Sequence, residues 1–408
     1  MTTPKFSLSD AGINADPYPL FARLRRERPV CRNTAGDGTV EWLVTRYADV
    51  DSLLNDKTRL SKDLRRIYRG KLGSFRRGDV ILSDLVNRHL LFRDPPEHTR
   101  LRSLVNKAFT RRNVADMAPQ IASISNRLLD RLDKSMETDL VQAYALPLPL
   151  SVIAGLLGIS EEDAASLRAC TAATIDQTNA EVTFKELTPQ LQEFLRYLDN
   201  IFEGRAPVDP SGLISHLLEV RENSDRLSKE ELFNMVILLV VAGFETVMNF
   251  IGNGTLNLLF HPEQKAKFLS EPASRDEAID ELLRHNGPTK SATRRWALED
   301  FELGGELIRR GDCVRLLIAS ANRDESVFAA ADELDLERKG PRSLTFGGGI
   351  HHCLGGMLAR MQGRIALQTL FERYPELCLA VPQEQLRYRS SVLVRGLEAL
   401  PVYLHPPK

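Results

Sequence analysis

Helical periodicity is the dominant pattern along this chain, and its longest stretch covers residues 228–260. Apolar side chains occur nearly all round that helix, which predicts that it is buried. Ser228 and Glu231 stand three residues apart at its start, as in a capping box, and predict where it begins. Shorter stretches with apolar residues every three or four positions predict further helices at residues 17–28, 47–56, 113–134, 147–158, 161–207, 276–288 and 354–374.

β-Strands are predicted in fewer places. Residues 40–44, VEWLV, form one strand, and the chain beyond Pro288 is extended, with two strands separated by a turn at Gly311 and Asp312. The C-terminal segments LCLAV and LVRGLEALPVYL predict a β-hairpin. The predicted fold class is therefore mainly α with a smaller β region. No linker rich in proline, glycine or serine divides the chain, so we predict a single domain over residues 1–408 without a fused reductase.

Composition narrows the class of protein. Of the 408 residues, 43% are hydrophobic and 27% are charged, which is typical of a globular protein with a large core. The net charge of −1 argues against a general nucleic-acid binder. Five scattered cysteines without a C-x-x-C pair indicate a reducing compartment. The N-terminus lacks an apolar signal core, and no apolar run approaches the ~20 residues needed to cross a membrane, so we expect a soluble, cytoplasmic protein.

Residues 346–355, FGGGIHHCLG, present one cysteine just before a predicted helix. A helix N-terminus offers free N–H groups and a partial positive charge, both of which stabilise a thiolate. A thiolate held in this way can bind iron, and the neighbouring glycines let the backbone approach a flat cofactor. The alternative is a buried structural cysteine. The combined spacing of Phe346, His351, Cys353 and Gly355 favours the iron ligand.

A second unusual segment, AGFET, lies within the long buried helix. Gly243 costs about 1 kcal/mol relative to alanine inside a helix, and Glu245 and Thr246 are polar residues in an apolar stretch. Ala242 and Thr246 stand four apart, so the threonine hydroxyl can bond back to the Ala242 carbonyl while Gly243 leaves room for a ligand. The result is a polar notch suited to binding and protonating dioxygen. The alternative is a threonine that is simply bonded within its own helix.

A third segment, DPPEHTRLR, opens a helix at Pro95 and Pro96. His98 and Arg102 are four residues apart and share a face, where they could hold a carboxylate. The alternative is an exposed basic helix.

Together these segments resemble the cytochrome P-450 family. The chain meets every position of the family pattern F-x-x-G-x-(H/R)-x-C-x-G, and AGFET is similar to A-G-x-(D/E)-T. The resemblance implies a triangular helical prism around a buried haem b, with Cys353 as the iron ligand. It implies that Glu245 relays protons and that Thr246 steadies iron-bound oxygen. One departure is Val247, where the family often has a second hydroxyl.

The resemblance also assigns the remaining cofactor contacts. The residues expected to bind the haem propionates are His98, Arg102, Arg295 and His351. Those expected to lie against the haem are Ala242, Gly243, Phe346, Gly347 and Gly355. Glu281 and Arg284 match the family's E-x-x-R pair, which Arg338 completes as a structural third partner. The family's proline and phenylalanine near Arg338 are replaced by Ala331 and Leu334.

Several surface and pocket segments are less specific. Residues 62–77 are strongly basic and indicate either a solvated face or a site that attracts an anionic or carrier-bound substrate. Residues 171–207 should form lid helices, and residues 291–294 and 392–394 should face the substrate. Candidates for a basic face that docks a redox partner are Arg111, Arg112, Arg360 and Arg364.

The function implied is a haem-thiolate monooxygenase of the soluble bacterial type. It would insert one oxygen atom from O2 into a C–H bond of a small organic molecule of secondary metabolism, using a separate ferredoxin-type partner. The alternatives are desaturation or aryl coupling on the same chemistry, a peroxide-driven variant, and a haem protein that binds ligands without turnover. The Glu245–Thr246 pair argues against the last two.

Overall fold

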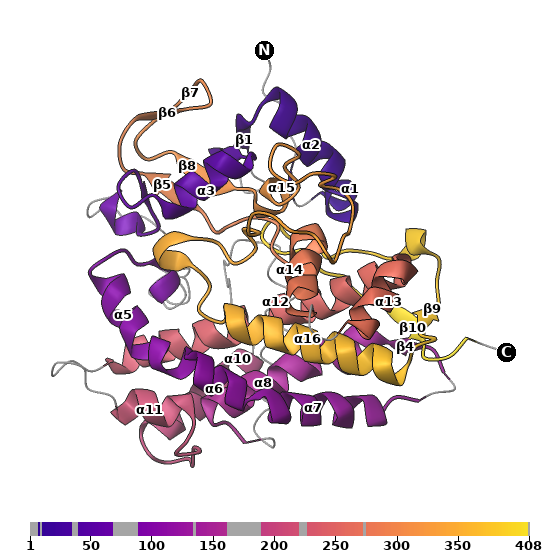
Figure 1. Ribbon diagram of the computed structural model, residues 1–408. Helices are drawn as coiled ribbons and strands as arrows, with labels where there is room; N and C mark the ends of the chain where they lie inside the picture. The colour runs from indigo at the N-terminus through magenta and orange to yellow at the C-terminus, as the bar shows by residue number, and fades with distance from the viewer. Residues whose placement is uncertain are drawn as a thin grey trace. The chain divides into compact units, whose positions relative to one another are not determined.

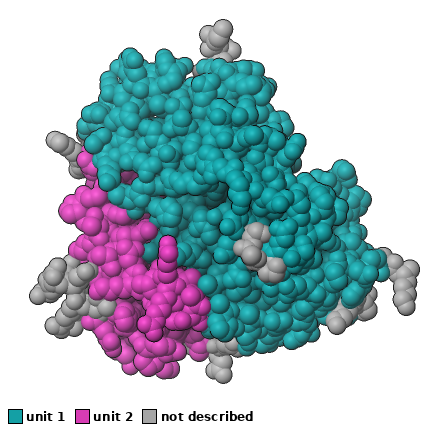
Figure 2. Space-filling model, in the orientation of Figure 1, with its two compact units in different colours: residues 1–61, 118–146, 246–408 teal, residues 62–117, 147–245 magenta. Residues whose placement is uncertain are grey.

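The computed structural model of this protein describes residues 7–8, 10–34, 40–67, 89–133, 136–160, 189–219, 227–271 and 275–406 (Figure 1). The chain divides into two compact units, which Figure 2 shows in different colours. Unit 1 comprises Met1–Ser61, Ala118–Leu146 and Thr246–Lys408, and unit 2 comprises Lys62–Met117 and Pro147–Glu245.

A five-stranded sheet organises unit 1, with its strands in the order β1-β2-β8-β5-β3. These strands are Val30–Thr34, Val40–Val44, Cys313–Leu316, Arg295–Ala297 and Leu60–Ser61. β1 and β2 form an antiparallel pair, β2 runs parallel to β8, and β5 runs antiparallel to both β8 and β3. The strand predicted at residues 40–44 is confirmed.

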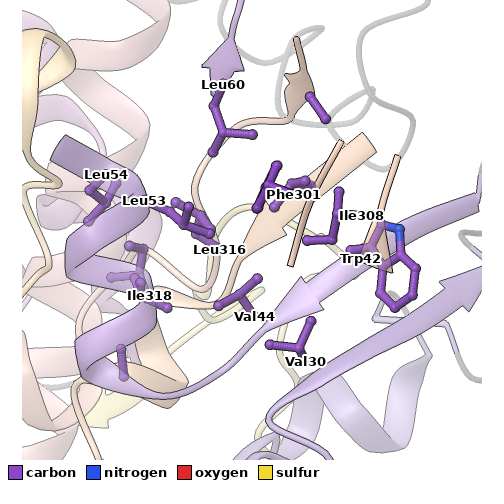
Figure 3. Close-up of a cluster of buried hydrophobic side chains, with 14 of the residues drawn as sticks. Val30, Trp42, Val44, Leu53, Leu54, Leu60, Phe301, Ile308, Leu316 and Ile318 are labelled. Carbon is purple, nitrogen blue, oxygen red and sulfur yellow. The ribbon is translucent and has the colours of Figure 1, made fainter. Parts of the chain in front are cut away.

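Helix α3 (Tyr47–Asn55) lies against this sheet and closes a hydrophobic cluster. Figure 3 shows Leu53 of the helix directed toward Leu316 of the strands, and Leu54 and Val44 belong to the same cluster. All four side chains are buried, at 5% exposure or less. Burial of this kind is the main favourable term in folding, so the cluster fixes the end of α3 firmly on the sheet.

The smaller strands differ in part from the prediction. Residues 301–316 contain three strands rather than two, because β6 (Phe301–Leu303) and β7 (Glu306–Ile308) form a tight hairpin before β8. Its turn is Gly304–Gly305, and both glycines have positive φ, +59° and +81°, as a two-residue hairpin of this kind requires. The predicted C-terminal pairing is present, since β9 (Cys378–Leu379) is antiparallel to β10 (Pro401–Tyr403), and β4 (Thr138–Asp139) adds a third strand.

The described helices of unit 1 include most of those predicted for it. They are α1 (Ala11–Ala15), α2 (Tyr18–Glu27), α3, α7 (Ala118–Asp130), α13 (Pro262–Ser270), α14 (Arg275–Asn286), α15 (Ile318–Ala321) and α16 (Gly356–Arg373). Short 3-10 or π segments are η5 (Val141–Ala145), η7 (Gly349–His351) and η8 (Gln383–Gln385). The helix predicted at residues 113–134 is broken, because the Met117 N–H bonds the Val114 carbonyl and ends α6 in a tight turn.

Unit 2 is helical in its described part. Its helices are α5 (Glu97–Asn106), α6 (Arg111–Asp116), α8 (Pro147–Leu157), α10 (Pro189–Phe202) and α11 (Leu213–Glu219), with short turns η1 (Leu64–Arg66), η3 (Leu90–Phe92) and η4 (Lys107–Phe109). The helix predicted at 147–158 is confirmed. Of the lid helices predicted at 171–207, only the part from residue 189 lies within the described residues, and α10 ends at Phe202.

Helix α12 (Lys229–Phe260) is the long helix predicted at residues 228–260. Its capping box is formed as expected, because the Glu231 N–H donates to Ser228 Oγ at 3.1 Å and the Ser228 N–H donates to Glu231 Oε2 at 2.8 Å. Among the described residues, α12 alone is long and apolar enough to cross a membrane, but 67% of its most apolar window is buried. A helix in the core of a soluble protein passes the same test.

Candidate functional site

The loop that carries Cys353 is a tight turn in front of α16. Gly347 and Gly349 have φ values of +69° and +62°, which favour glycine, and η7 turns the chain between them and the cysteine. The Cys353 N–H donates to the Phe346 carbonyl at 2.9 Å and closes the turn. Cys353 is exposed and lies three residues before Gly356, where α16 begins. The predicted position of Cys353, in a loop directly before a helix N-terminus, is therefore confirmed, while its role as the iron ligand stays a prediction.

One side of this loop is pressed against the rest of unit 1. A Cβ at Gly349 would lie 2.5 Å from the Leu54 carbonyl, so the loop backbone sits directly on the end of α3. The guanidinium of Arg360 lies 4.2 Å from the centre of the Phe346 ring, a distance that suits a cation–π contact. The hydrophobic cluster under α3 thereby holds the cysteine loop in place.

The other side of the loop is open. A Cβ at Gly355 would meet no described atom within 4 Å, and one at Gly347 would meet only the His351 carbonyl, at 4.0 Å. An exposed thiol flanked by two such glycines fits a large flat group bound through one sulfur. The residues of the loop thus fit a thiolate-ligated haem.

The AGFET segment contains both open and buried positions in the middle of α12. Ala242 is exposed and Gly243 and Thr246 are half-buried, whereas Phe244 and Glu245 are buried, at 0% and 5% exposure. The absence of a side chain at Gly243 lets α12 pack closely against α8, because a Cβ there would lie 3.3 Å from Ile153 Cδ1. The expected bond from the Thr246 hydroxyl to the Ala242 carbonyl stays a prediction.

The four residues predicted to hold carboxylates lie in different elements. In α5 of unit 2, His98 is buried and Arg102 is half-buried, with its Nε donating to Asn106 Oδ1 at 3.2 Å. Burial, then the charges of Arg102 and Lys62, lowers the pKa of His98 to about 4, so it is a neutral hydrogen-bonding group near pH 7. In unit 1, Arg295 is buried in β5 and His351 is half-buried in η7. Their common role toward one cofactor stays a prediction.

The charged trio predicted near the cysteine loop is formed. Glu281 Oε2 accepts from Arg284 Nε at 2.6 Å, and Glu281 Oε1 accepts from Arg284 Nη2 at 2.8 Å and from Arg338 Nε at 3.1 Å. Glu281 and Arg284 are buried, at 5% and 3% exposure. The two departures from the family pattern are accommodated, because Ala331 and Leu334 are both buried and the Ala331 carbonyl accepts from Arg284 at 2.7 Å.

Asn322 and Thr345, which the sequence did not single out, connect this trio to the cysteine loop. The Asn322 carbonyl accepts from Arg284 Nη1 at 2.9 Å, while its side chain accepts from the Leu344 N–H and donates to Thr345 Oγ1. Thr345 Oγ1 in turn donates to the Leu283 carbonyl at 3.0 Å. A buried chain of hydrogen bonds therefore ties α14 to the residue just before Phe346.

The two segments expected to face the substrate are joined in unit 1. The N–H groups of Lys290 and Ser291 donate to the Leu393 carbonyl at 2.8 and 3.2 Å, and Thr289 forms a bridge with Val394. Lys290 itself is 1% exposed, and its Nζ donates to the Leu8 carbonyl and to Asn14 Oδ1. Burial, then the charges of Arg395 and Arg315, lowers its pKa to about 7. Nothing in the sequence indicated that this lysine is buried.

The basic segment is not a free positive face in its described part. Arg65 pairs with Asp63 and Glu97, and Arg66 pairs with Asp94 at 3.0 Å, all within unit 2. Lys62 is 4% exposed. Arg65 and Arg66 are nevertheless exposed, so the interpretation of this segment as a solvated or anion-attracting surface stays a prediction, and residues 68–77 lie outside the described residues.

The arginines suggested for a docking face are also mostly paired. Arg360 Nε donates to Asp280 Oδ1 at 2.6 Å, and Arg364 lies 3.2 Å from Asp276. Arg112 lies 4.0 Å from Asp116, and Arg111 is exposed. Exposed ion pairs of this kind contribute little to stability, so the four arginines stay candidates for docking.

Known proteins resemble this chain over nearly its whole length. The family model for cytochrome P-450 matches residues 275–395. The polyketide biosynthesis cytochrome P-450 PksS of Bacillus subtilis (strain 168) is 39% identical over 394 residues, which cover 95% of this chain and 96% of that protein. Vitamin D(3) 25-hydroxylase of Pseudonocardia autotrophica is 40% identical over 392 residues, which cover 96% and 94%.

Solved structures agree on the fold. That of PksS has a TM-score of 0.88 at 38% identity and covers 98% of this chain and 100% of its own. CxnD, the cytochrome P-450 enzyme for C–S bond formation in chuangxinmycin biosynthesis, has a TM-score of 0.89 at 34% identity and covers 99% and 98%. P450BioI, solved with an acyl carrier protein ligated to hexadec-9Z-enoic acid, has a TM-score of 0.84 at 34% identity and covers 96% and 99%.

Two independent likenesses, in sequence and in structure, thus extend across the chain. The mainly helical fold with a smaller sheet region is the fold of these proteins. The chain therefore belongs to the cytochrome P-450 family of haem-thiolate enzymes and is a monooxygenase of that family.

Proposed function

We propose that this protein binds haem b through Cys353 and inserts one oxygen atom from O2 into a C–H bond of a small organic molecule of secondary metabolism. A separate ferredoxin-type partner in the cytoplasm would supply the electrons. The observation that carries this proposal is the exposed Cys353 thiol in front of α16, with open space beside Gly347 and Gly355. A thiolate-ligated haem, when bound, supplies the reductive activation of O2.

Charged and neutral side chains of the chain would bind the haem propionates in different ways. Arg102 and Arg295 offer guanidinium groups to the propionates, and charge-assisted bonds of this type are the stronger ones. His98 and His351 offer ring N–H donors, and His98 is neutral because of its burial. Ala242 and Gly243 of unit 2 and Phe346, Gly347 and Gly355 of unit 1 would contact the group without competing polar side chains, as the family resemblance implies.

Glu245 and Thr246 handle protons in this proposal. Glu245 is buried in α12, and its carboxyl group would take up and release protons during turnover. Thr246 stands half-buried on the same open face as Ala242, where its hydroxyl can orient a water or an oxygen atom. This pair favours turnover with O2 over a peroxide-driven reaction or simple ligand binding.

Thr246→Ala tests this assignment. We expect NADH oxidation with a surrogate ferredoxin system to continue, while product per NADH falls about tenfold or more and peroxide accumulates, because general acid–base groups contribute ~10²–10⁴-fold. The matched control is Thr255→Ala, since Thr255 is buried in the same helix and its hydroxyl donates only to the Ile251 carbonyl, at 2.8 Å. Equal coupling in both variants would show that protons arrive without Thr246.

The substrate class is proposed from the likenesses. PksS is named for polyketide biosynthesis and P450BioI was solved with an acyl carrier protein, so we propose a polyketide-like or acyl substrate, either free or carrier-bound. CxnD, named for C–S bond formation, keeps a different oxidative outcome open as the second candidate. Product analysis distinguishes the two, since hydroxylation adds one oxygen atom and bond formation adds none.

A spectral titration tests the substrate class. Purified holoprotein would be titrated with free fatty acids, macrolides, terpenoids, steroids and aromatic acids, and separately with acyl carrier proteins bearing the same acyl chains. We expect the low-spin to high-spin shift of haem absorption with an acyl or polyketide-like compound. A shift only with the carrier-bound form would assign the carrier as a partner, and a shift only with steroids or aromatic acids would refute the proposed class.

A further inference from the structure

The segment of residues 391–395 reverses the usual distribution of polar and apolar side chains. Ser391 and Arg395 are buried, at 2% and 6% exposure, whereas Leu393 and Val394 between them are half-buried. Polar side chains are normally the exposed ones, so a buried polar residue is the informative exception. Leu393 and Val394 therefore offer apolar surface, and the polar residues on either side of them need interior partners.

A second buried cation, Lys290, stands in the segment bonded to this one. It is 1% exposed, and in the described part of the chain its Nζ donates to two uncharged oxygens, the Leu8 carbonyl and Asn14 Oδ1, at 2.8 and 2.6 Å. The charges that influence it, those of Arg395 and Arg315, are positive too. Burying a cationic side chain costs free energy unless it is well bonded. The two bonds from Nζ therefore decide how this lysine is held.

Asn14, near the end of α1, bonds to both segments. Its Oδ1 accepts from Lys290 Nζ and, at 3.4 Å, from the Ser391 N–H, while its backbone carbonyl accepts from Arg395 Nη1. Its Nδ2 donates to the Asp10 carbonyl at 3.0 Å, which orients the carboxamide. Asn14 is 3% exposed, so bulk water has little access to these bonds. One side chain thus holds a residue of each segment.

Other contacts of the N-terminal residues strengthen this connection. The Ala15 carbonyl accepts from Arg395 Nη2 at 3.0 Å. Val392 packs against the hydrophobic cluster that contains Leu8. The segment of residues 391–395 is therefore attached to the N-terminal part of the chain by polar and apolar contacts together.

The two segments are also bonded to each other. The Lys290 N–H donates to the Leu393 carbonyl at 2.8 Å, and Thr289 forms a β-bridge with Val394. Leu393 and Val394 are therefore placed by the segment that contains Lys290. Because Asn14 holds the side chain of Lys290, the position of the apolar surface depends on a carboxamide close to the N-terminus.

We propose that Asn14 is a positioning residue for the reaction. Acting through Lys290, it fixes where Leu393 and Val394 meet the substrate. The inference rests on the proposed function, in which these two side chains contact a polyketide-like or acyl molecule. A shift of this apolar surface changes which C–H bond of the substrate is presented for oxidation, and it leaves the groups that handle protons unchanged.

Hydrogen–deuterium exchange of the holoprotein tests the connection without a substrate. Asn14→Leu keeps the side-chain size and removes both polar atoms. We expect the backbone N–H groups of residues 288–295 and 391–397 to exchange about tenfold faster than in the wild type, because local opening becomes easier when two hydrogen bonds are lost. Lys290→Met removes the shared bond from the other side at similar volume and should have the same effect. Unchanged exchange in either variant overturns the proposal.

Two further variants separate positioning from a general loss of stability. Asn14→Asp keeps the acceptor for Lys290 Nζ and the Ser391 N–H and removes only the side-chain donor, so exchange should stay at the wild-type rate. Asn126→Leu is the matched control in unit 1, because Asn126 also donates to a carbonyl four residues earlier and accepts from a cation, Arg373 Nη1, at 3.3 Å. It should leave exchange in both segments unchanged. Faster exchange there in Asn126→Leu would show that the effect is not specific to Asn14.

Product analysis tests the effect on the reaction. The probe is myristic acid, or the acyl compound of the spectral titration with a larger shift, because many similar C–H bonds along one chain make the ratio of hydroxylated positions a measure of placement. We expect this ratio to change about tenfold in Asn14→Leu, since a misplacement of ~1 Å can cost about 10²-fold in rate. It should stay near the wild-type value in Asn14→Asp and Asn126→Leu.

The outcomes distinguish this inference from the proposed function. An unchanged product ratio in Asn14→Leu, together with faster exchange, refutes the positioning role and leaves the proposed function intact. Wild-type protein that gives neither a spin-state shift nor a product with any acyl or polyketide-like compound of the titration contradicts the proposed function itself, and the positioning role with it.

Discussion

A Cys353→Ala variant will lose the haem-thiolate spectrum of the reduced carbon monoxide complex together with all monooxygenase activity. Among the cysteines that the structure describes, Cys31 and Cys313 are buried and only Cys353 is exposed. No other described thiol is equally accessible to a bound cofactor. The helix N-terminus behind Cys353 favours the thiolate, and alanine supplies no iron ligand. Difference absorption spectra of purified protein would measure the loss directly.

The control for this variant is Cys378→Ala. Cys378 is partly buried in β9, away from the cysteine loop in sequence, and the same thiol-to-methyl change there should leave the spectrum intact. A thiolate-type spectrum that survives in Cys353→Ala would show that the iron ligand is assigned to the wrong residue.

Glu281→Gln is expected to cause a large loss of stability. Glu281 receives three hydrogen bonds from Arg284 and Arg338, and the amide would leave two largely buried guanidinium groups without their countercharge. Removing one partner of a buried ion pair costs about 3–5 kcal/mol. We expect a fall of that order in the free energy of unfolding, measured by urea denaturation of the holoprotein, and a lower haem content.

The matched control is Glu277→Gln, one turn earlier in α14, where the carboxylate is exposed. The same chemical change there should alter the free energy of unfolding by no more than about 0.5 kcal/mol. If Glu281→Gln behaves like Glu277→Gln, the trio contributes little, and the hydrogen bonds of Asn322 and Thr345 hold the cysteine loop by themselves.

Much of the local structure follows from short patterns in the sequence. The capping box at Ser228 and Glu231 and the strand at residues 40–44 depend on neighbouring residues, and both are formed as predicted. The trio of Glu281, Arg284 and Arg338 was inferred by resemblance to a family, and its geometry is confirmed.

What the sequence did not indicate depends on contacts between distant segments. Lys290 is buried because the carbonyl of Leu8 and the side chain of Asn14 reach it from the N-terminus, and no local pattern predicts that pairing. The cations at Arg65 and Arg66 looked like free surface charge because Asp94 and Glu97 lie about thirty residues further along the chain. Long-range pairing of this kind becomes visible only in the folded chain.

The parallel pairing of β2 with β8 has a consequence for how the protein is made. Glu41 and Arg315 are joined by a buried ion pair across this pairing, although 274 residues separate them. At synthesis rates of about 5–20 residues per second, roughly 14–55 s pass between the appearance of the two residues. Throughout that time β2 presents an unpaired edge, and such edges pair readily with other chains. The yield of soluble protein from a cell will therefore depend on chaperones that protect residues 40–44 until the second half of the chain has been translated.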